Sequence, residues 1–490
     1  MLPPEHYIDL AAGKFNKTSP ADLAQLFTKV GQSAAKDHVV IHFHGGLVSR
    51  ASAEASAEGL LPTYESAGAY PVFFFWRSDL WTTLSKNLSE IAQEPVFKRL
   101  VKRLLQLAFS KLKDHAGAKS GGTLPLVSES SLPDDPVLLA EYAAAREPNN
   151  ATLADASLTE SQVEQAELEL ETDAVLLEES RAIAEWTAPT VADASTTARA
   201  GTGAATAPRP TLMSTSVRNE LAQEQAKTGA RAGLFTVVAL AKHGIMILKR
   251  VIERFAGRRD HGLYVTIVEE VLRELYLDSI GALAWTLMKN DTRDAFGADA
   301  QLFGGTAFLA ELKKWWQPGR RITLVGHSTG AIYIGNFLEH ADSLLDPAAK
   351  FDVVFLAPAC SFEFMAEKRP FFERRVNRVR LFGLRDERER GYWEVPVLYP
   401  ASLLYLVSGL FEEPTVDMPL VGMQRYFSDS DPYATPGMKT VANYFDEKCV
   451  WSLAEGAAAG LNSGAARHGG FDEDPATRES LKEFLRTGGG

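Results

Sequence analysis

The sequence predicts an α/β fold in which a mainly parallel sheet is covered by helices, with a large helical and partly disordered insertion. Short apolar segments at 39–43, 71–76 and 351–356 have the composition of buried strands, and helical segments separate them. Buried strands that are joined through helices form parallel sheets with both faces covered. With 46% hydrophobic residues in 490, the chain can bury a large core.

Three parts of the chain differ in composition. Residues 1–82 and 301–490 carry the predicted strands and form the two parts of the α/β core. Residues 83–300 form the insertion, which we expect to be a helical cap. Within it, the segment from about 116 to 213 is rich in Ala, Ser, Thr, Glu and Pro, so we expect an acidic disordered segment, most clearly at 189–210. A transient or docked acidic helix over 158–186 stays open as an interpretation.

The remaining parts of the insertion have apolar residues at helical spacing, at 94–115, 230–255 and 263–289. The first of these helices also carries a basic face that includes Lys98 and Lys102. Two interpretations of that helix stay open, namely contact with an anionic membrane surface and packing inside the cap, and we favour packing.

The most informative motif is the sequence Gly-x-Ser-x-Gly that follows the apolar strand beginning at Ile322. It predicts a tight strand-to-helix turn that holds the hydroxyl of Ser328 up into a pocket. Gly326 and Gly330 fit positions where side chains would collide with neighbouring backbone. The helix that follows directs its N-terminal amides, including that of Thr329, toward any negative charge that develops there.

A second glycine turn lies upstream, where a β-branched strand ends in His44-Gly45-Gly46-Leu47. Because Gly45 and Gly46 have no side chains, the backbone of this loop can closely approach a reacting carbonyl group. We therefore expect the amides of Gly46 or Leu47 to act with that of Thr329 as oxyanion donors.

One histidine stands out among the ten in the chain. His468 lies in a glycine-rich loop between a strand and the last predicted helix, which makes it the candidate general base. The side chain of His327, within the serine motif, is expected to point away from the pocket. His42 and His44 alternate at a strand end and are interpreted as packing or loop-bracing groups.

A carboxylate should orient that histidine. Asp386 follows the strand at 378–384 and lies between the serine and the histidine in the chain, so it is the candidate acid. The alternatives that remain open are Glu363, Glu387, Asp417 and Asp429.

Together these motifs resemble the α/β-hydrolase superfamily, over about residues 1–90 and 300–490. The stretches 399–412 and 419–426 are similar to bacterial α/β-hydrolases without an assigned substrate. The resemblance implies the α/β-hydrolase fold and the chain order Ser, Asp, His. The chain departs from the family in one respect, because its large insertion precedes the nucleophile strand instead of following the sixth strand.

The function that these residues predict is that of a serine hydrolase, a carboxylesterase or lipase-like enzyme with Ser328, His468 and Asp386 as its triad. An amidase, a peptidase or a thioesterase could use the same triad. A partner- or membrane-binding module on a hydrolase scaffold is the alternative from another class. The apolar insertion helices favour a small-molecule or lipid-like ester as substrate.

Composition restricts the remaining possibilities. The chain has two cysteines, Cys360 and Cys449, and its first residues do not resemble a signal peptide, so we expect a cytoplasmic protein. No zinc-like ligand spacing or phosphate loop occurs in the sequence, and we expect no cofactor or metal. Residues 121–210 carry 16 Asp and Glu against 4 Arg and no Lys, which alone accounts for the formal net charge of −12. Nothing in that balance favours a nucleic-acid partner.

Overall fold

A computed structural model describes residues 2–46, 48–76, 80–120, 133, 135–144, 157–187, 211–228, 232–277, 280, 282–412 and 416–487. The chain divides into two compact units. The sheet unit comprises Met1–Thr83, Ala282–Glu394 and Ala401–Gly490. The helical unit comprises Leu84–Gly281 and Val395–Pro400.

The sheet unit is built on an eight-stranded sheet with the order β2-β1-β4-β3-β5-β6-β7-β8. The strands are β1 (Tyr7–Ala11), β2 (Lys14–Phe15), β3 (His38–Phe43), β4 (Tyr70–Phe75), β5 (Arg321–His327), β6 (Phe351–Leu356), β7 (Val376–Leu384) and β8 (Cys449–Ser452). Only the β1–β2 pair is antiparallel; the other six pairs are parallel. The predicted mainly parallel sheet is confirmed, and β1 and the edge strand β2 are additional to it.

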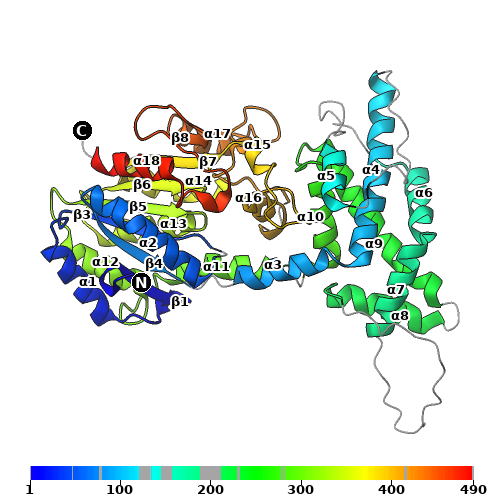
Figure 1. The fold of residues 1–490 in the computed structure, drawn as a ribbon, viewed down its shortest axis with the longest axis horizontal. Helices are drawn as coiled ribbons and strands as arrows, with labels where there is room; N and C mark the ends of the chain where they lie inside the picture. Colours follow the sequence, from blue (N-terminus) through cyan, green and yellow to red (C-terminus); the bar gives the residue numbers. More distant parts are fainter. Residues whose placement is uncertain are drawn as a thin grey trace, which may run out of the picture. The chain divides into compact units, whose positions relative to one another are not determined.

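Helices cover this sheet on both faces, because every residue of β3, β4 and β6 is buried. The longer helices of the sheet unit are α1 (Pro20–Gln32), α2 (Arg50–Ser66), α11 (Ala282–Asp294), α12 (Gly304–Trp315), α13 (Gly330–Leu344), α14 (Phe362–Arg375), α17 (Pro436–Phe445) and α18 (Pro475–Arg486). Helices α2 and α18 pack against each other (Figure 1), while α1, α12, α13, α14 and α17 pack in succession. The central strand β5 lies between β3 and β6.

Local sequence signals explain where the last helix begins. The side chain of Asp474 accepts a hydrogen bond from the backbone N–H of Thr477 at 2.7 Å, and Pro475 occupies the first helical turn. An acceptor before the helix and a proline just inside it are favoured at N-termini. The same carboxylate accepts the backbone N–H of Gly464 at 2.9 Å, so it also ties down the loop that contains His468.

The helical unit holds α4 (Pro95–Ser120), α5 (Pro136–Ala144), α6 (Glu160–Glu171), α7 (Ala174–Thr187), α8 (Thr215–Thr228), α9 (Ala232–Ala256) and α10 (Leu263–Leu275); α3 (Leu80–Ile91) runs from one unit into the other. The single helix expected at 263–289 is two helices, α10 and α11. Helix α10 ends at Leu275, whose carbonyl accepts the backbone N–H of Ser214 at 2.6 Å instead of a bond from a further helical turn.

Part of the segment from about 116 to 213 is helical, and residues 158–186, where the sequence allows a docked acidic helix, include α6 and most of α7. Helices α5, α6 and α7 lie within residues 116–213, and α6 and α7 pack on α9. Their buried residues recur at helical spacing, such as Ala166 and Leu170, and Leu176 and Ile183, so they bury an apolar stripe despite the acidic composition. Between α6 and α7, the buried carboxylate of Asp173 pairs with Arg99 and Arg103 of α4. The segment 189–210 lies outside the described residues.

The segment Val395–Pro400 belongs to the helical unit although it is distant in sequence. The hydroxyl of Tyr399 donates to Glu269 at 2.5 Å, and that buried carboxylate also pairs with Arg254 and His261, each at 2.7 Å. These contacts attach the segment to helix α10. None of the helices that the structure describes is apolar over a length sufficient to cross a membrane.

The sequence places residues 282–294 in the insertion, but these residues form helix α11 of the sheet unit. The side chain of Asn336 on α13 donates to the hydroxyl of Thr292 on α11 at 3.0 Å, and both residues are buried. This buried hydrogen bond explains why α11 belongs with the helices that cover the sheet.

Three buried, neutral histidines lie on or next to β3, which contains His38 and His42 and is followed by His44. His38 Nε2 lies 2.9 Å from the hydroxyl of Thr323, and His42 Nδ1 lies 2.8 Å from that of Tyr64. Burial lowers the pKa of His38 to about 3, that of His42 to about 4 and that of His44 to about 3, from 6.5. Their structural roles agree with the packing and bracing expected for His42 and His44.

These three histidines predict an acid-sensitive fold. The unfolded chain binds protons at each below pH 6.5 whereas the folded chain does not, so stability is lost as the pH falls from 6.5 toward 4. Each group adds about 1.4 kcal/mol per pH unit, so the three together contribute a slope of up to about 4 kcal/mol per unit. Urea denaturation between pH 4 and 8 measures it, and His38→Gln should remove about one third of this contribution. An unchanged stability across that range would contradict the assignment.

Candidate active site

Ser328 occupies a sharp turn between β5 and α13. Its φ of 53° is in the left-handed region, which non-glycine residues rarely adopt. Flanking glycines permit the turn. A Cβ on Gly330 would collide with the carbonyl oxygen of Phe43, and one on Gly326 would lie 2.7 Å from Ile334 Cδ1. The predicted strand-to-helix turn is therefore present in the structure.

Neighbouring backbone fixes the position of Ser328. Its N–H donates to the carbonyl of Leu356, at the end of β6, at 2.8 Å, and its own carbonyl accepts from Ala359 at 3.0 Å. The residue is buried, and among the described residues no hydrogen bond engages its hydroxyl. The hydroxyl is thus held by a strained backbone and not by a partner.

The loop after β3 lies directly against this turn. A Cβ on Gly45 would be 3.3 Å from Cβ of Ser328, and a Cβ on Gly46 would be 2.5 Å from Oγ1 of Thr329. A side chain at Gly46 would displace the Thr329 side chain, so this loop and the serine turn pack closely. The structure thus brings Gly46 and Thr329 together, whereas Leu47 lies outside the described residues.

His44 braces this loop from behind. Its Nδ1 lies 2.6 Å from the carbonyl of Gly45, and its Nε2 accepts the backbone N–H of Trp76 at 3.3 Å. A carbonyl can only accept and Nε2 is itself an acceptor, so the ring is the neutral Nδ1–H tautomer. The indole of Trp76 stacks on it, with ring centroids 4.0 Å apart. The orientation of the Gly45 peptide is thereby fixed.

Thr329 has two hydrogen-bond donors, its backbone N–H and its hydroxyl, that bond to none of the described residues. No described hydrogen bond involves its backbone N–H. Its side chain is fully buried, and Oγ1 has no hydrogen-bond partner. Buried polar groups without partners are uncommon in folded proteins, and a catalytic role is one of the explanations for them.

His468 occupies the short helix η8 (His468–Gly470), after β8 and before α18. The residue is 3% exposed, and neither ring nitrogen has a hydrogen-bond partner among the described residues. Burial, together with the positive charge of His327, lowers the pKa of His468 to about 3. The imidazole is therefore neutral at physiological pH, which is the form that a general base requires.

Asp472 and His327 form a pair that sequence reasoning did not find. His327 Nδ1 lies 2.9 Å from Oδ2 of Asp472, and His327 Nε2 lies 3.1 Å from the carbonyl oxygen of His468. The rings of His327 and His468 are 5.5 Å apart. The available signal was the spacing of Asp472, four residues after His468 in a glycine-rich loop. His327 points toward this loop.

Asp386 lies at the start of the short helix α15 (Asp386–Glu389), directly after β7. Its carboxylate accepts the hydroxyl of Tyr405 at 2.6 Å and pairs with Arg390 at 3.2 Å. No described hydrogen bond connects it to His468. Its use as the triad acid therefore requires a change of partner.

The four alternative acids that the sequence offers form no hydrogen bond with His468 either. Glu363, Glu387 and Asp429 are exposed. Asp417 is fully buried, but it accepts the hydroxyls of Tyr426 and Tyr433, each at 2.6 Å. Asp417 therefore has the contacts of a structural group.

The arrangement contains several of the groups that acyl transfer by a serine requires. Ser328 carries its hydroxyl on a strained turn, and two backbone segments lie around it. The neutral, buried imidazole of His468 lies on a loop that a hydrogen bond from His327 connects to this turn. Catalytic hydrogen bonds are often absent or long in unliganded proteins, so the missing contacts of His468 are compatible with that chemistry.

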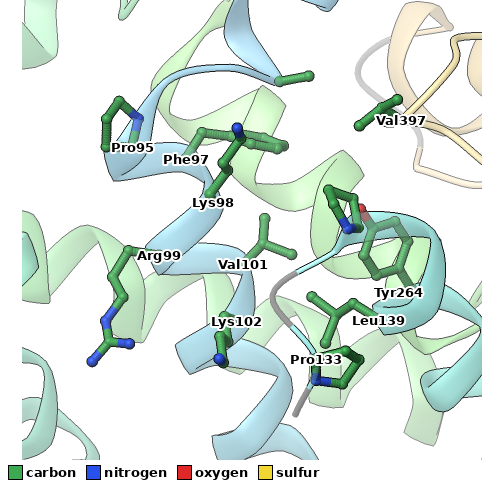
Figure 2. A pocket seen from close by; sticks show the side chains of 12 residues that line it. Pro95, Phe97, Lys98, Arg99, Val101, Lys102, Pro133, Leu139, Tyr264 and Val397 are labelled. Atoms are coloured by element: carbon green, nitrogen blue, oxygen red, sulfur yellow. The ribbon is translucent and has the colours of Figure 1, made fainter.

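A separate hollow of about 250 Å³ lies in the helical unit (Figure 2). Phe97, Val101, Leu139 and Tyr264 form apolar parts of its lining, and Lys98 is one of its basic residues. All of its lining residues belong to the helical unit, and no predicted site residue is among them.

No protein-family model matches the chain, and neither a curated protein nor a solved structure matches it. Within the described ranges, no group of three or more His, Cys, Asp or Glu side chains is placed to hold a metal ion. The functional argument therefore depends on the geometry around Ser328.

The close contact at Gly330 predicts the effect of one methyl group. Gly330→Ala should destabilise the protein by about 2–4 kcal/mol, because the new Cβ collides with the backbone carbonyl of Phe43. Gly31→Ala is the matched control, because nothing lies within 4 Å of its Cβ position in α1, and it should stabilise by about 0.5–1 kcal/mol. Chemical denaturation measures both, and equal stabilities would disprove the contact.

Proposed function

We propose that this protein is a serine hydrolase of the α/β-hydrolase class that cleaves a carboxylic ester. The observation that carries the proposal is the strained turn at Ser328, with the Gly45–Gly46 loop in contact with it. Both features lie at the carboxyl ends of parallel strands, which is where open α/β sheets bind their ligands. The chain order of Ser328, Asp386 and His468, after β5, β7 and β8, also supports it.

In the proposed mechanism Ser328 attacks the ester carbonyl. His468 removes the hydroxyl proton and later donates it to the leaving alcohol. The backbone N–H of Thr329 and that of Gly46 or Leu47 hold the oxyanion, and each donor contributes on the order of 3 kcal/mol of transition-state stabilisation. Water then hydrolyses the acyl-enzyme by the same steps.

The carboxylate that supports His468 in this mechanism is Asp386. To do so, it exchanges its hydrogen bond from Tyr405 for one from the imidazole. Its role is to orient the ring and to stabilise the imidazolium that forms during attack.

The first test is the reactivity of Ser328. The wild-type protein should hydrolyse p-nitrophenyl esters and react with a fluorophosphonate probe. Ser328→Ala should remove the labelling and lower kcat/KM at least about a thousandfold, and His468→Ala should lower kcat/KM similarly because the two residues act as a unit. Ser343→Ala is the control, because that serine is exposed on α13. Labelling that persists in Ser328→Ala would refute the assignment of the nucleophile.

A second test concerns the acid. Asp386→Asn should lower kcat by on the order of a thousandfold or more, because the amide favours the wrong imidazole tautomer. Glu387→Gln, an exposed neighbour on the same short helix, should change kcat little. If Asp386→Asn remains active, another group supports His468, although the nucleophile assignment is unaffected.

The bond type is tested with matched substrates. Ester, thioester and anilide substrates with the same acyl group, compared by kcat/KM, distinguish an esterase from a thioesterase, an amidase or a peptidase. An ester preference is expected, and a higher kcat/KM on the anilide would replace the ester proposal with an amidase.

A further inference from the structure

His327 makes hydrogen bonds through both of its ring nitrogens although it is almost fully buried. Nδ1 faces the carboxylate of Asp472 at 2.9 Å, and Nε2 faces the backbone carbonyl of His468 at 3.1 Å. The residue directly before the candidate nucleophile is thus bonded to the loop that carries the candidate base. These bonds connect the end of β5 with the segment that precedes α18.

The partners of the two ring nitrogens limit the protonation state of His327. A backbone carbonyl cannot donate, so Nε2 must carry a proton. Nδ1 lies 2.9 Å from Oδ2 of Asp472, so the pair shares one further proton. In the ion-paired form this proton is on Nδ1, and although burial alone would raise the pKa of Asp472, the charge and hydrogen bond of His327 lower it to about 2. In that form the ring is an imidazolium.

The surroundings favour this charge. Burial alone would lower the pKa of His327, but the charge and hydrogen bond of Asp472 outweigh burial and raise the pKa above 6.5. The other titratable groups that interact with this pair are His42 on β3, His44 after β3, His468 on η8, Tyr64 on α2 and Arg478 on α18. Of these, His42 and Arg478 lower the pKa of Asp472. Asp472 is thus the nearby carboxylate that keeps His327 protonated.

We propose that His327 is a positioning residue whose imidazolium holds Asp472 and the backbone of His468 against the nucleophile turn, so that loss of one proton releases the His468 loop and stops catalysis. The proposal rests on the proposed hydrolase function. Its consequence is a reversible loss of activity at alkaline pH that originates outside the catalytic residues.

The direction of the effect follows from the pKa of His327. Because that pKa is raised in the folded protein, the stabilisation is fully present below 6.5 and is lost as the pH rises through the folded-state pKa. When the ring of His327 is neutral, one of its nitrogens carries a lone pair. That lone pair faces either the carbonyl of His468 or the carboxylate of Asp472. A repulsive contact then replaces one of the two hydrogen bonds.

The direct test is a nuclear magnetic resonance titration of the full-length protein with ¹⁵N-labelled histidine, using His327→Gln to assign the signal. The expected result is that His327 carries two N–H protons at pH 7 and titrates above 6.5. In Asp472→Asn its pKa should fall below 6.5, because burial then acts without the compensating charge. A neutral His327 at pH 6 in the wild-type protein would overturn the proposal.

The kinetic test is the pH profile of kcat/KM on a p-nitrophenyl ester. The wild-type profile should fall at alkaline pH with the pKa that the titration assigns to His327. His327→Gln should lose that alkaline limb and retain about a tenth of the activity at pH 7, because its amide replaces one of the two hydrogen bonds. Asp472→Asn should move the limb to lower pH. His340→Gln, a partly exposed histidine on α13, is the control and should leave the limb in place.

The outcomes separate this proposal from the proposed function. If the wild-type protein hydrolyses esters and His327→Gln keeps the same alkaline limb, the positioning role is wrong and the hydrolase assignment stands. If the wild-type protein hydrolyses no ester, the hydrolase proposal fails, and with it the catalytic part of this inference. If His327→Gln does not fold, the wild-type titration and the shift in Asp472→Asn still decide the protonation state of His327.

Discussion

The candidate site depends on one close backbone contact, that of Gly330 with the carbonyl oxygen of Phe43. Helix α13 can begin against the end of β3 only because no side chain separates them. The same approach places Gly45 against Ser328 and Gly46 against Thr329, while β6 holds Ser328 from the other side through Leu356. A strained serine is therefore held between the strands that flank β5.

Burial acts on all the histidines near this turn, yet it does not give them the same charge. His42, His44 and His468 are neutral because desolvation penalises the cation. His327 is as deeply buried, but the charge and hydrogen bond of the Asp472 carboxylate outweigh the effect of burial and raise its pKa. The carboxylate of Asp472 thus accounts for the opposite pKa shifts of His327 and of the candidate base His468, whose rings are 5.5 Å apart.

In the helical unit, too, buried charges are stabilised by partners of opposite charge. Buried carboxylates there are paired, as Asp173 is with two arginines of α4 and Glu269 is with Arg254 and His261. Removing one partner of such a pair leaves an uncompensated charge, which is strongly destabilising. These pairs explain how an acidic segment and the distant residue Tyr399 are held in the unit.

The sequence by itself determined the parallel sheet, because β-branched and aromatic runs at β3, β4 and β6 can only be buried on both faces. It also determined the turn at Ser328, since glycines two residues before and after a serine suit little else between a strand and a helix. The acidic composition of residues 116–213 does not show how much of this segment is helical, because α6 and α7 need only an apolar stripe at helical spacing to pack on α9. Only the tertiary structure decided the partners of the ionisable groups. Asp386 lies with Tyr405 and Arg390, and Asp472 with His327, because the pairing of charges depends on distances between segments far apart in the chain, which no local pattern encodes.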